Sequence, residues 1–141
     1  MPNLPTRRFG RTELPIPLLS LGGMRFQQSW TDLPASEITS DSQANLQATL
    51  QRATQLGLHH VETARHYGSS ERQLGWAFPT TPDPTRILQS KVPPREDPDA
   101  FEAELALSFE RLGCQRLDLL AIHGINLPEH LEQTLRPGGC M

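Results

Sequence analysis

The stretch RILQSKV, residues 86–92, contains a short apolar run that leads to a reactive side chain, the amine of Lys91. Three other short runs in the chain repeat this arrangement. The polar or glycine residues that follow the four runs are Glu62 with Tyr67, Lys91, His123, and the pair Gly22 and Gly23. Barrels of parallel strands carry their chemistry at the C-terminal ends of the strands. The pattern therefore predicts four strands whose ends meet at one site.

Helical patterns fill the intervals between these runs. The clearest covers residues 98–112, where Asp97 can cap the first turn, Pro98 suits the first position and Gly113 ends the helix. Its apolar stripe consists of Phe101, Leu105, Phe109 and Leu112. A second helix is predicted over about residues 41–56. Its apolar face consists of Leu46, Leu50 and Ala53.

Shorter elements complete the pattern. Ser70 and Gln73 have the spacing of a capping box, which predicts a short helix through Trp76. A hairpin is predicted near the N-terminus, over residues 7–16. The polar stretch 24–40 is a long loop, and such loops are more often functional than filler. The predicted strands cover residues 18–21, 59–63, 86–92 and 116–122, and a last helical stretch covers residues 128–135.

Strands and helices alternate at intervals of about thirty residues, which is the βαβ signature of a parallel sheet. The expected fold class is α/β, a parallel (β/α)8 barrel of the triosephosphate isomerase type. A closed barrel of eight strands needs roughly 250 residues, and four units fit in this chain. We therefore expect residues 1–141 to form one domain, about half of such a barrel. Because the last helical stretch leads into Pro137-Gly138-Gly139, the chain is interpreted as a fragment.

Composition excludes several classes of protein. The chain has 13 Lys and Arg against 16 Asp and Glu, so it lacks the positive charge of a nucleic-acid or anionic-membrane binder. No run of apolar residues is long enough to span a bilayer. With Cys114 and Cys140 far apart, no metal motif or disulfide framework is predicted. His59 and His60 would point to opposite faces of a strand, so no metal site is expected. We expect a cytoplasmic protein with two free thiols.

The reactive side chains suit one kind of chemistry. Tyrosine has a reference pKa of about 10, too high for efficient proton donation at neutral pH, and a neighbouring ammonium group favours the phenolate. A carboxylate would hold the amine charged, and an imidazole can bond a substrate oxygen. Such a set can protonate a carbonyl oxygen while hydride reaches the carbon. Hydride requires a nicotinamide or flavin cofactor, because no side chain supplies it.

Four segments together resemble one known family. ETARHYGSSE (residues 62–71) resembles the Asp-Thr-Ala-x-x-Tyr-Gly-x-Ser-Glu signature of the aldo-keto reductase superfamily. SKV (residues 90–92) and LDLLAIH (residues 117–123) resemble its Thr-Lys-Val and Leu-Asp-Leu-x-x-Ile-His segments. RFGRT (residues 8–12), followed by LGGM (residues 21–24), is similar to the opening of the family. The resemblance covers nearly the whole chain, in order and at suitable spacing.

The resemblance implies an NADPH-dependent reductase of aldehydes and ketones, with NADH as a possible cofactor. By this resemblance Tyr67 would be the general acid, tuned by Lys91, and His123 would orient the carbonyl. Glu62 stands where the family usually has Asp, which moves the carboxylate by about one bond length, and such displacements alter catalytic rates. The residues expected near the cofactor are Gly22, Gly23 and Met24. Most other cofactor contacts of the family come from later strands.

Other interpretations remain open at this point. The chain could be a non-catalytic half-barrel that binds or assembles with another half, and self-association through its unclosed edge is then expected. It could also be a lyase in which Lys91 forms a Schiff base. Each reactive residue has an ordinary structural reading as well: Tyr67 as a packed aromatic, and His123 as a core histidine. Asp118 is expected to be a structural partner. Substrate selectivity would come from the loop at 24–40, which contains Trp30.

Overall fold

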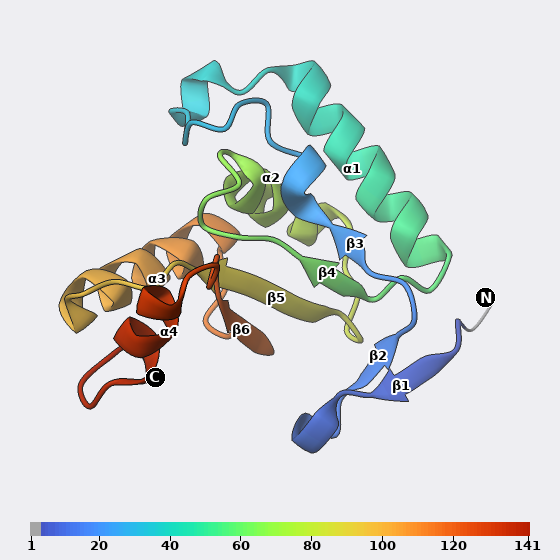
Figure 1. The fold of residues 1–141 in the computed structure, drawn as a ribbon. Coiled ribbons are helices and arrows are strands. Elements are labelled where there is room, and N and C mark those ends of the chain that lie inside the picture. Colours follow the sequence, from blue (N-terminus) through green and yellow to red (C-terminus); the bar gives the residue numbers. More distant parts are fainter. Residues whose placement is uncertain (1–3) are drawn as a thin grey trace.

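A parallel sheet of four strands organises the chain in the computed structural model, which describes residues 4–141. The strands follow the order of the sequence in space (Figure 1). They are β3 (Leu21–Gly22), β4 (His60–Glu62), β5 (Ile87–Val92) and β6 (Leu119–Ile122). All three pairings are parallel. The predicted parallel α/β sheet is confirmed. Of the domain predicted over residues 1–141, residues 1–3 lie outside the described part.

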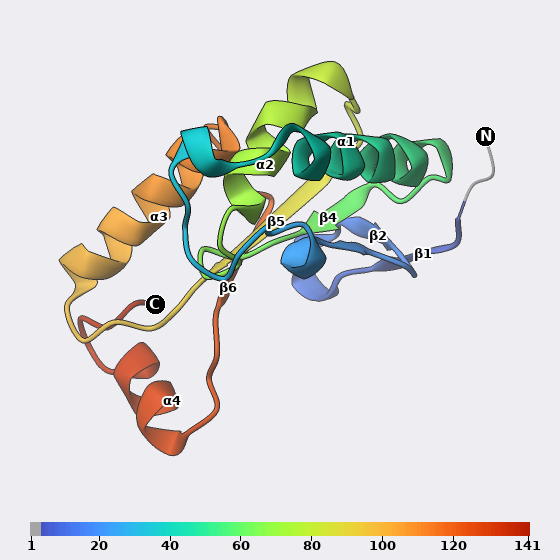
Figure 2. The same ribbon diagram turned by 90° about the horizontal axis from the view of Figure 1, so that it is seen from above.

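Helices cover one face of this sheet, as Figure 2 shows. The covering helices are α1 (Ser40–Gln55), α2 (Ser70–Ala77) and α3 (Pro98–Leu112). Helix α4 (Pro128–Leu135) follows β6 in the sequence and lies apart from these three helices in Figure 2. The buried apolar core lies between the sheet and these helices. Its members are Phe26, Leu46, Leu50, Val61, Leu74, Ala77, Leu88 and Leu112. Burial of this apolar surface is the main force that holds the helices against the strands. None of the helices within residues 4–141 is long and apolar enough to cross a membrane.

The two long helices follow the predicted start and stop signals. In α3 the side chain of Asp97 accepts a hydrogen bond from the Asp99 amide at 3.0 Å, Pro98 occupies the first turn, and Gly113 ends the helix at φ 62°. Helix α1 begins one residue earlier than predicted, because Thr39 is its cap. Its predicted apolar face is buried. In α3, Phe101 and Leu112 are buried, while the rest of the predicted stripe is half-buried.

Two local predictions were wrong. The predicted strand 18–21 forms only as Leu21–Gly22, and Leu18 and Leu19 are exposed. The reason is the N-terminal hairpin, β1 (Thr6–Arg8) with β2 (Pro15–Pro17), whose pairing extends until the Leu18 amide donates to the carbonyl of Pro5. The chain therefore meets β4 only from Leu21 onward. The hairpin itself was predicted.

The capping box at Ser70 was the second error. Ser69 is the N-cap of α2, and its hydroxyl donates to the side chain of Gln73 at 2.7 Å. Ser70 lies inside the helix and is fully buried. Its hydroxyl donates to the carbonyl of Gly23 at 2.9 Å and contacts the hydroxyl of Thr63 at 3.0 Å. The Ser70 hydroxyl therefore links α2 to the ends of β3 and β4 and does not cap the first turn of the helix.

Candidate active site

The four predicted reactive residues lie together at the C-terminal ends of adjacent strands. Glu62 is the last residue of β4, Lys91 is next to last in β5, and His123 directly follows β6. Tyr67 lies in the turn between β4 and α2. Parallel pairing brings these ends to one edge of the sheet. The structure therefore brings all four side chains together, from three strands and one turn.

The amine of Lys91 lies at the centre of this cluster. Its Nζ donates to the hydroxyl of Tyr67 and to the carbonyl of Thr63, both at 3.1 Å. It also forms an ion pair with the carboxylate of Glu62. These three partners match the three donors of an ammonium group. The geometry fixes the amine against the phenol in the way the sequence predicted.

Two opposing effects act on the charge of Lys91. Burial lowers its pKa to about 8, while the Glu62 carboxylate beside the amine favours the charged form. The amine is therefore charged at neutral pH and loses its proton at an unusually low pH for lysine. Lys91 is also the only lysine of the chain, and Tyr67 is the only tyrosine. Signals from either residue type report on this cluster alone.

His123 contacts the phenol from the side. Its ring lies edge-on to that of Tyr67, with centroids 5.4 Å apart and planes at 89°. Burial lowers the pKa of His123 below 6.5, and the positive charges of Lys91 and His66 lower it further. The imidazole is neutral at pH 7 and can donate or accept a hydrogen bond. This arrangement suits a group that orients a carbonyl oxygen.

The coupling between these residues can be measured without turnover. Replacing Lys91 by methionine is expected to raise the pKa of His123 part of the way to its ordinary value, because one nearby positive charge is lost while burial remains. An NMR titration of the histidine ring protons measures this change. Replacing Arg116, an exposed cation at the other end of β6, should leave His123 unchanged. An identical His123 midpoint in the Lys91→Met variant would contradict the shared site.

The turn that carries Tyr67 is held by backbone bonds. The amide of Arg65 donates to the carbonyl of Lys91 at 2.9 Å, so the pairing of the two strands continues beyond the end of β4. The Tyr67 amide donates to the carbonyl of Ala64 at 3.0 Å. Gly68 follows at φ 51° and packs directly on the backbone of Ser29. The phenol is thus placed by a turn that is bonded to the strand of its lysine partner.

The three residues predicted near a cofactor differ in their surroundings. Gly22 and Met24 are exposed, and a side chain at Gly22 would meet only the Glu62 carboxylate, at an ordinary 3.7 Å. Gly23 is buried, and a Cβ there would lie 2.8 Å from the Ser70 hydroxyl. Close packing against α2 therefore explains this glycine. Gly22 and Met24 have the open position that a ligand contact requires.

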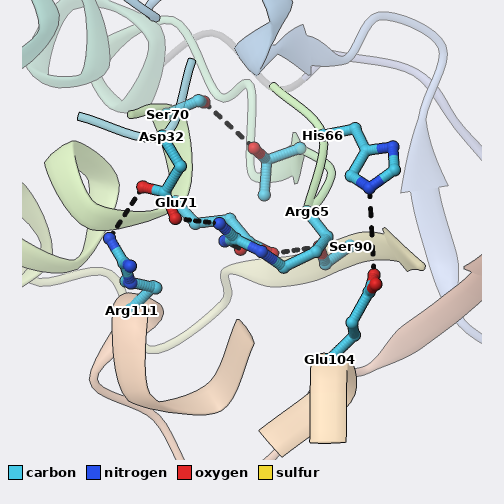
Figure 3. A network of polar contacts seen from close by, with 9 residues as sticks. Asp32, Arg65, His66, Ser70, Glu71, Ser90, Glu104 and Arg111 are labelled. Carbon is cyan, nitrogen blue, oxygen red and sulfur yellow. Dashed lines mark hydrogen bonds and ion pairs between the residues drawn. The ribbon is translucent and has the colours of Figure 1, made fainter. Parts of the chain in front are cut away.

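A network of charged side chains beside the site, partly buried, was not predicted. Figure 3 shows Arg65 between the carboxylates of Asp32 and Glu71, with Arg111 on the far side of Asp32. Arg65 and Glu71 lie in the stretch 62–71, where charged residues among small ones could have indicated an ion pair. Asp32 lies in the long loop, and nothing in its sequence neighbourhood marks it.

The structure also places Asp118 and Trp30, two further residues that the sequence singled out. Asp118 accepts bonds from the amide of Leu88 and the guanidinium of Arg116, both at 2.9 Å, which confirms a structural role. Trp30 is 64% exposed, in the loop beside the Tyr67 turn. Among residues 4–141, no three His, Cys, Asp or Glu side chains lie close enough to hold a metal ion.

Comparisons with known proteins place these features in a family. The sequence profile of the aldo/keto reductase family matches residues 18–136. None of the curated proteins matches the chain in sequence. Among solved structures, the chain is similar to a Pseudomonas aeruginosa protein assigned to the aldo-keto reductases, at 26% identity and a TM-score of 0.71, over 92% of this chain and 53% of that one.

Two further solved structures carry bound molecules. A thermostable aldo-keto reductase in complex with the inhibitor epalrestat is 28% identical, with a TM-score of 0.73, over 88% of this chain and 44% of that one. A Klebsiella pneumoniae aldo-keto reductase in complex with NADPH is 25% identical, with a TM-score of 0.64, over 94% of this chain and 44% of that one.

The chain spans about half the length of the structures that it matches. Its four parallel strands with their outer helices correspond to half of a (β/α)8 barrel, as the sequence predicted. The matched profile includes β3 to β6 and all four residues of the cluster around Lys91. The chain belongs to the aldo/keto reductase family.

Proposed function

We propose that this chain carries the proton-donating part of an NADPH-dependent oxidoreductase that reduces aldehydes or ketones to alcohols. In this proposal Tyr67 is the general acid, Lys91 tunes it, His123 orients the carbonyl and Glu62 holds Lys91. The observation that carries the proposal is the 3.1 Å hydrogen bond from Lys91 Nζ to the hydroxyl of Tyr67, at the strand edge where barrels carry their chemistry.

The proposed proton transfer uses only groups of this cluster. Tyr67 donates its phenolic proton to the carbonyl oxygen of the substrate. The ammonium group of Lys91 stabilises the phenolate that remains, and Glu62 keeps that ammonium charged and in place. The neutral ring of His123 offers a hydrogen bond to the same substrate oxygen, which fixes the direction of approach. Proton donation by a positioned group typically contributes about 10²–10⁴-fold to a rate.

A nicotinamide cofactor, when bound, supplies the hydride that reaches the carbonyl carbon. The exposed residues Gly22 and Met24, at the end of β3, are the proposed contacts of this chain with it, and Gly22 lies beside Glu62. The carbonyl of Gly23, which lies between them in the sequence, accepts a hydrogen bond from the Ser70 hydroxyl and so fixes this segment to α2. The Klebsiella relative that was solved with NADPH supports the choice of NADPH as the cofactor. A cytoplasmic location fits this activity and stays a prediction.

Binding and turnover of NADPH test the proposal. The two tryptophans, Trp30 and Trp76, provide a fluorescence signal for titration with NADPH. The titration should be made on this chain alone and on its fusion to the C-terminal half of the Klebsiella reductase. We expect the fusion to bind NADPH and to consume it when an aldehyde is added. A folded fusion that binds NADPH and leaves every aldehyde and ketone of a broad panel unreduced would overturn the proposal.

The lowered pKa of Lys91 also favours one second candidate, a Schiff-base lyase. An amine with a pKa of about 8 has more of its nucleophilic form near neutral pH than an ordinary lysine. Borohydride added with a carbonyl compound would trap such an intermediate. Because Lys91 is the only lysine, peptide mass analysis separates its adduct from that of the α-amino group. A reductase leaves Lys91 unlabelled, and a lyase labels it.

A non-catalytic half-barrel remains the other alternative. Within residues 4–141, β3 and β6 each pair on one side only, and Leu120 of β6 is exposed. Unpaired strand edges with apolar side chains favour association. Self-association of this chain through these edges therefore stays a prediction.

A further inference from the structure

A network of charged side chains surrounds Arg65, which stands two residues before Tyr67 in the same turn (Figure 3). Arg65 donates from Nη1 to a Glu71 carboxylate oxygen at 2.5 Å and from Nη2 to Asp32. Arg111 donates to the other oxygen of Asp32 at 2.7 Å. Arg65 is 6% exposed and Glu71 is 1% exposed. Asp32 and Arg111 are partly exposed, at 28% and 13%. Two carboxylates and two guanidinium groups thus balance each other, and the pair of Arg65 with Glu71 is the buried part of the network.

The network joins segments that are distant in the sequence. Asp32 belongs to the loop between β3 and α1, Arg65 to the turn after β4, Glu71 to α2 and Arg111 to α3. The single guanidinium group of Arg65 therefore fixes the Tyr67 turn to a loop on one side and to a helix on the other. The planar fork of arginine can hold two carboxylates at once, which the single ammonium of lysine does not reproduce.

These contacts reach the segments that carry Tyr67 and Lys91, the proposed general acid and the amine that tunes it. The backbone amide of Arg65 donates to the carbonyl of Lys91 at 2.9 Å. Glu71 accepts a hydrogen bond from the buried hydroxyl of Ser90 at 2.6 Å, and Ser90 immediately precedes Lys91. On the other side, Arg65 stands two residues before Tyr67. The Arg65 side chain thus acts two residues before Tyr67 and, through Glu71 and Ser90, next to Lys91, so its ion pair with Glu71 lies between the two segments that carry the bond.

Energetics argue that this network serves precision. Burying charges costs free energy, and well-packed apolar residues in their place are often as stable or more stable. Stability alone is therefore a weak reason for the buried pair of Arg65 and Glu71 at this position. Hydrogen bonds with fixed directions restrain geometry more tightly than apolar contacts do, and small displacements of reacting groups lower rates strongly.

We propose that Arg65 is a positioning residue, which holds the Tyr67 turn against Lys91 by anchoring it to Asp32 and Glu71. The inference rests on the proposed function, since it assigns Arg65 a part in placing the proposed general acid. Arg65 acts through these contacts and does not touch the substrate.

The test measures the side-chain NMR signal of Lys91. Because the chain has one lysine and one tyrosine, isotope-labelled lysine gives a single side-chain NMR signal, and its contact with Tyr67 gives a single cross-peak. The variant is Arg65→Lys, which keeps the charge and removes the fork. We expect the Lys91 titration midpoint to rise from about 8 by at least about one pH unit, and the cross-peak to weaken, because a loosened turn admits water.

A matched control separates positioning from general destabilisation. Asp83 is a buried carboxylate that pairs with His59 before the first residue of β5, at the end opposite to Lys91. The variant Asp83→Asn is expected to lower the unfolding temperature and to leave the Lys91 signal unchanged. A folded Arg65→Lys variant with the wild-type midpoint and cross-peak would overturn the inference.

Two further measurements distinguish a failure of this inference from a failure of the proposed function. If Arg65→Lys does not fold, Asp32→Asn replaces it, since this change weakens the links of Asp32 to Arg65 and Arg111 and leaves the pair of Arg65 with Glu71 intact. A smaller shift in the same direction is expected, and no shift overturns the inference. If wild-type protein itself lacks the cross-peak between Lys91 and Tyr67, the proposed function fails, whatever the variants do.

Discussion

Replacing Tyr67 by phenylalanine is expected to lower the rate of NADPH-dependent carbonyl reduction by about 10²–10⁴-fold, the usual contribution of a general acid. The phenol oxygen is the atom that the proposal places between Lys91 and the substrate, and phenylalanine removes that atom alone. The ring remains to pack against His123. The rate of NADPH loss in the fusion protein described above measures the effect.

The expected loss concerns the chemical step and not the fold. The Tyr67 side chain is half-buried, and its hydroxyl bonds to Lys91, so the unfolding temperature should change little. NADPH binding should also be retained, because the proposed contacts at Gly22 and Met24 are untouched. Replacing the exposed Trp76 by phenylalanine is the control, and it should leave the rate unchanged. A folded Tyr67→Phe variant with an unchanged rate would assign proton donation to another group, with His123 the first to examine.

The cluster around Lys91 could be predicted because its residues stand next to strands. Glu62, Lys91 and His123 each close a short apolar run, and parallel pairing forces such ends to one edge. Tyr67 is five residues beyond Glu62, within a turn too short to leave that edge. For these four residues, the position in the sequence relative to a strand end is therefore enough to predict the position in space.

The charged network around Arg65 could not be predicted in the same way. Asp32 lies in a loop of irregular sequence, and it meets Arg111 across 79 positions of the chain. No local pattern encodes a contact of that range. The error at Ser70 has a related cause: the spacing of a capping box is real, yet the hydroxyl finds a better partner in the distant carbonyl of Gly23. Where a local sequence signal and a long-range contact compete for the same side chain, the long-range contact determines the structure.

Replacing Gly68 by alanine is expected to reduce the free energy of unfolding by about 3 kcal/mol or more. Two penalties add at this position. Its φ of 51° is unfavourable for a residue with a Cβ, and that Cβ would overlap the backbone carbonyl of Ser29. Urea unfolding followed by tryptophan fluorescence measures the loss.

Gly113 separates the two penalties. It has a similar φ of 62°, and a Cβ there would meet nothing within 4 Å. The variant Gly113→Ala should therefore cost only about 1 kcal/mol. The difference between the two variants gives the cost of moving the loop that carries Ser29 away from the turn of Tyr67. Equal losses would contradict a close contact between the two segments. A larger loss at Gly68 would mean that the loop around Ser29 is packed tightly against the turn of Tyr67, since Gly68 directly follows Tyr67.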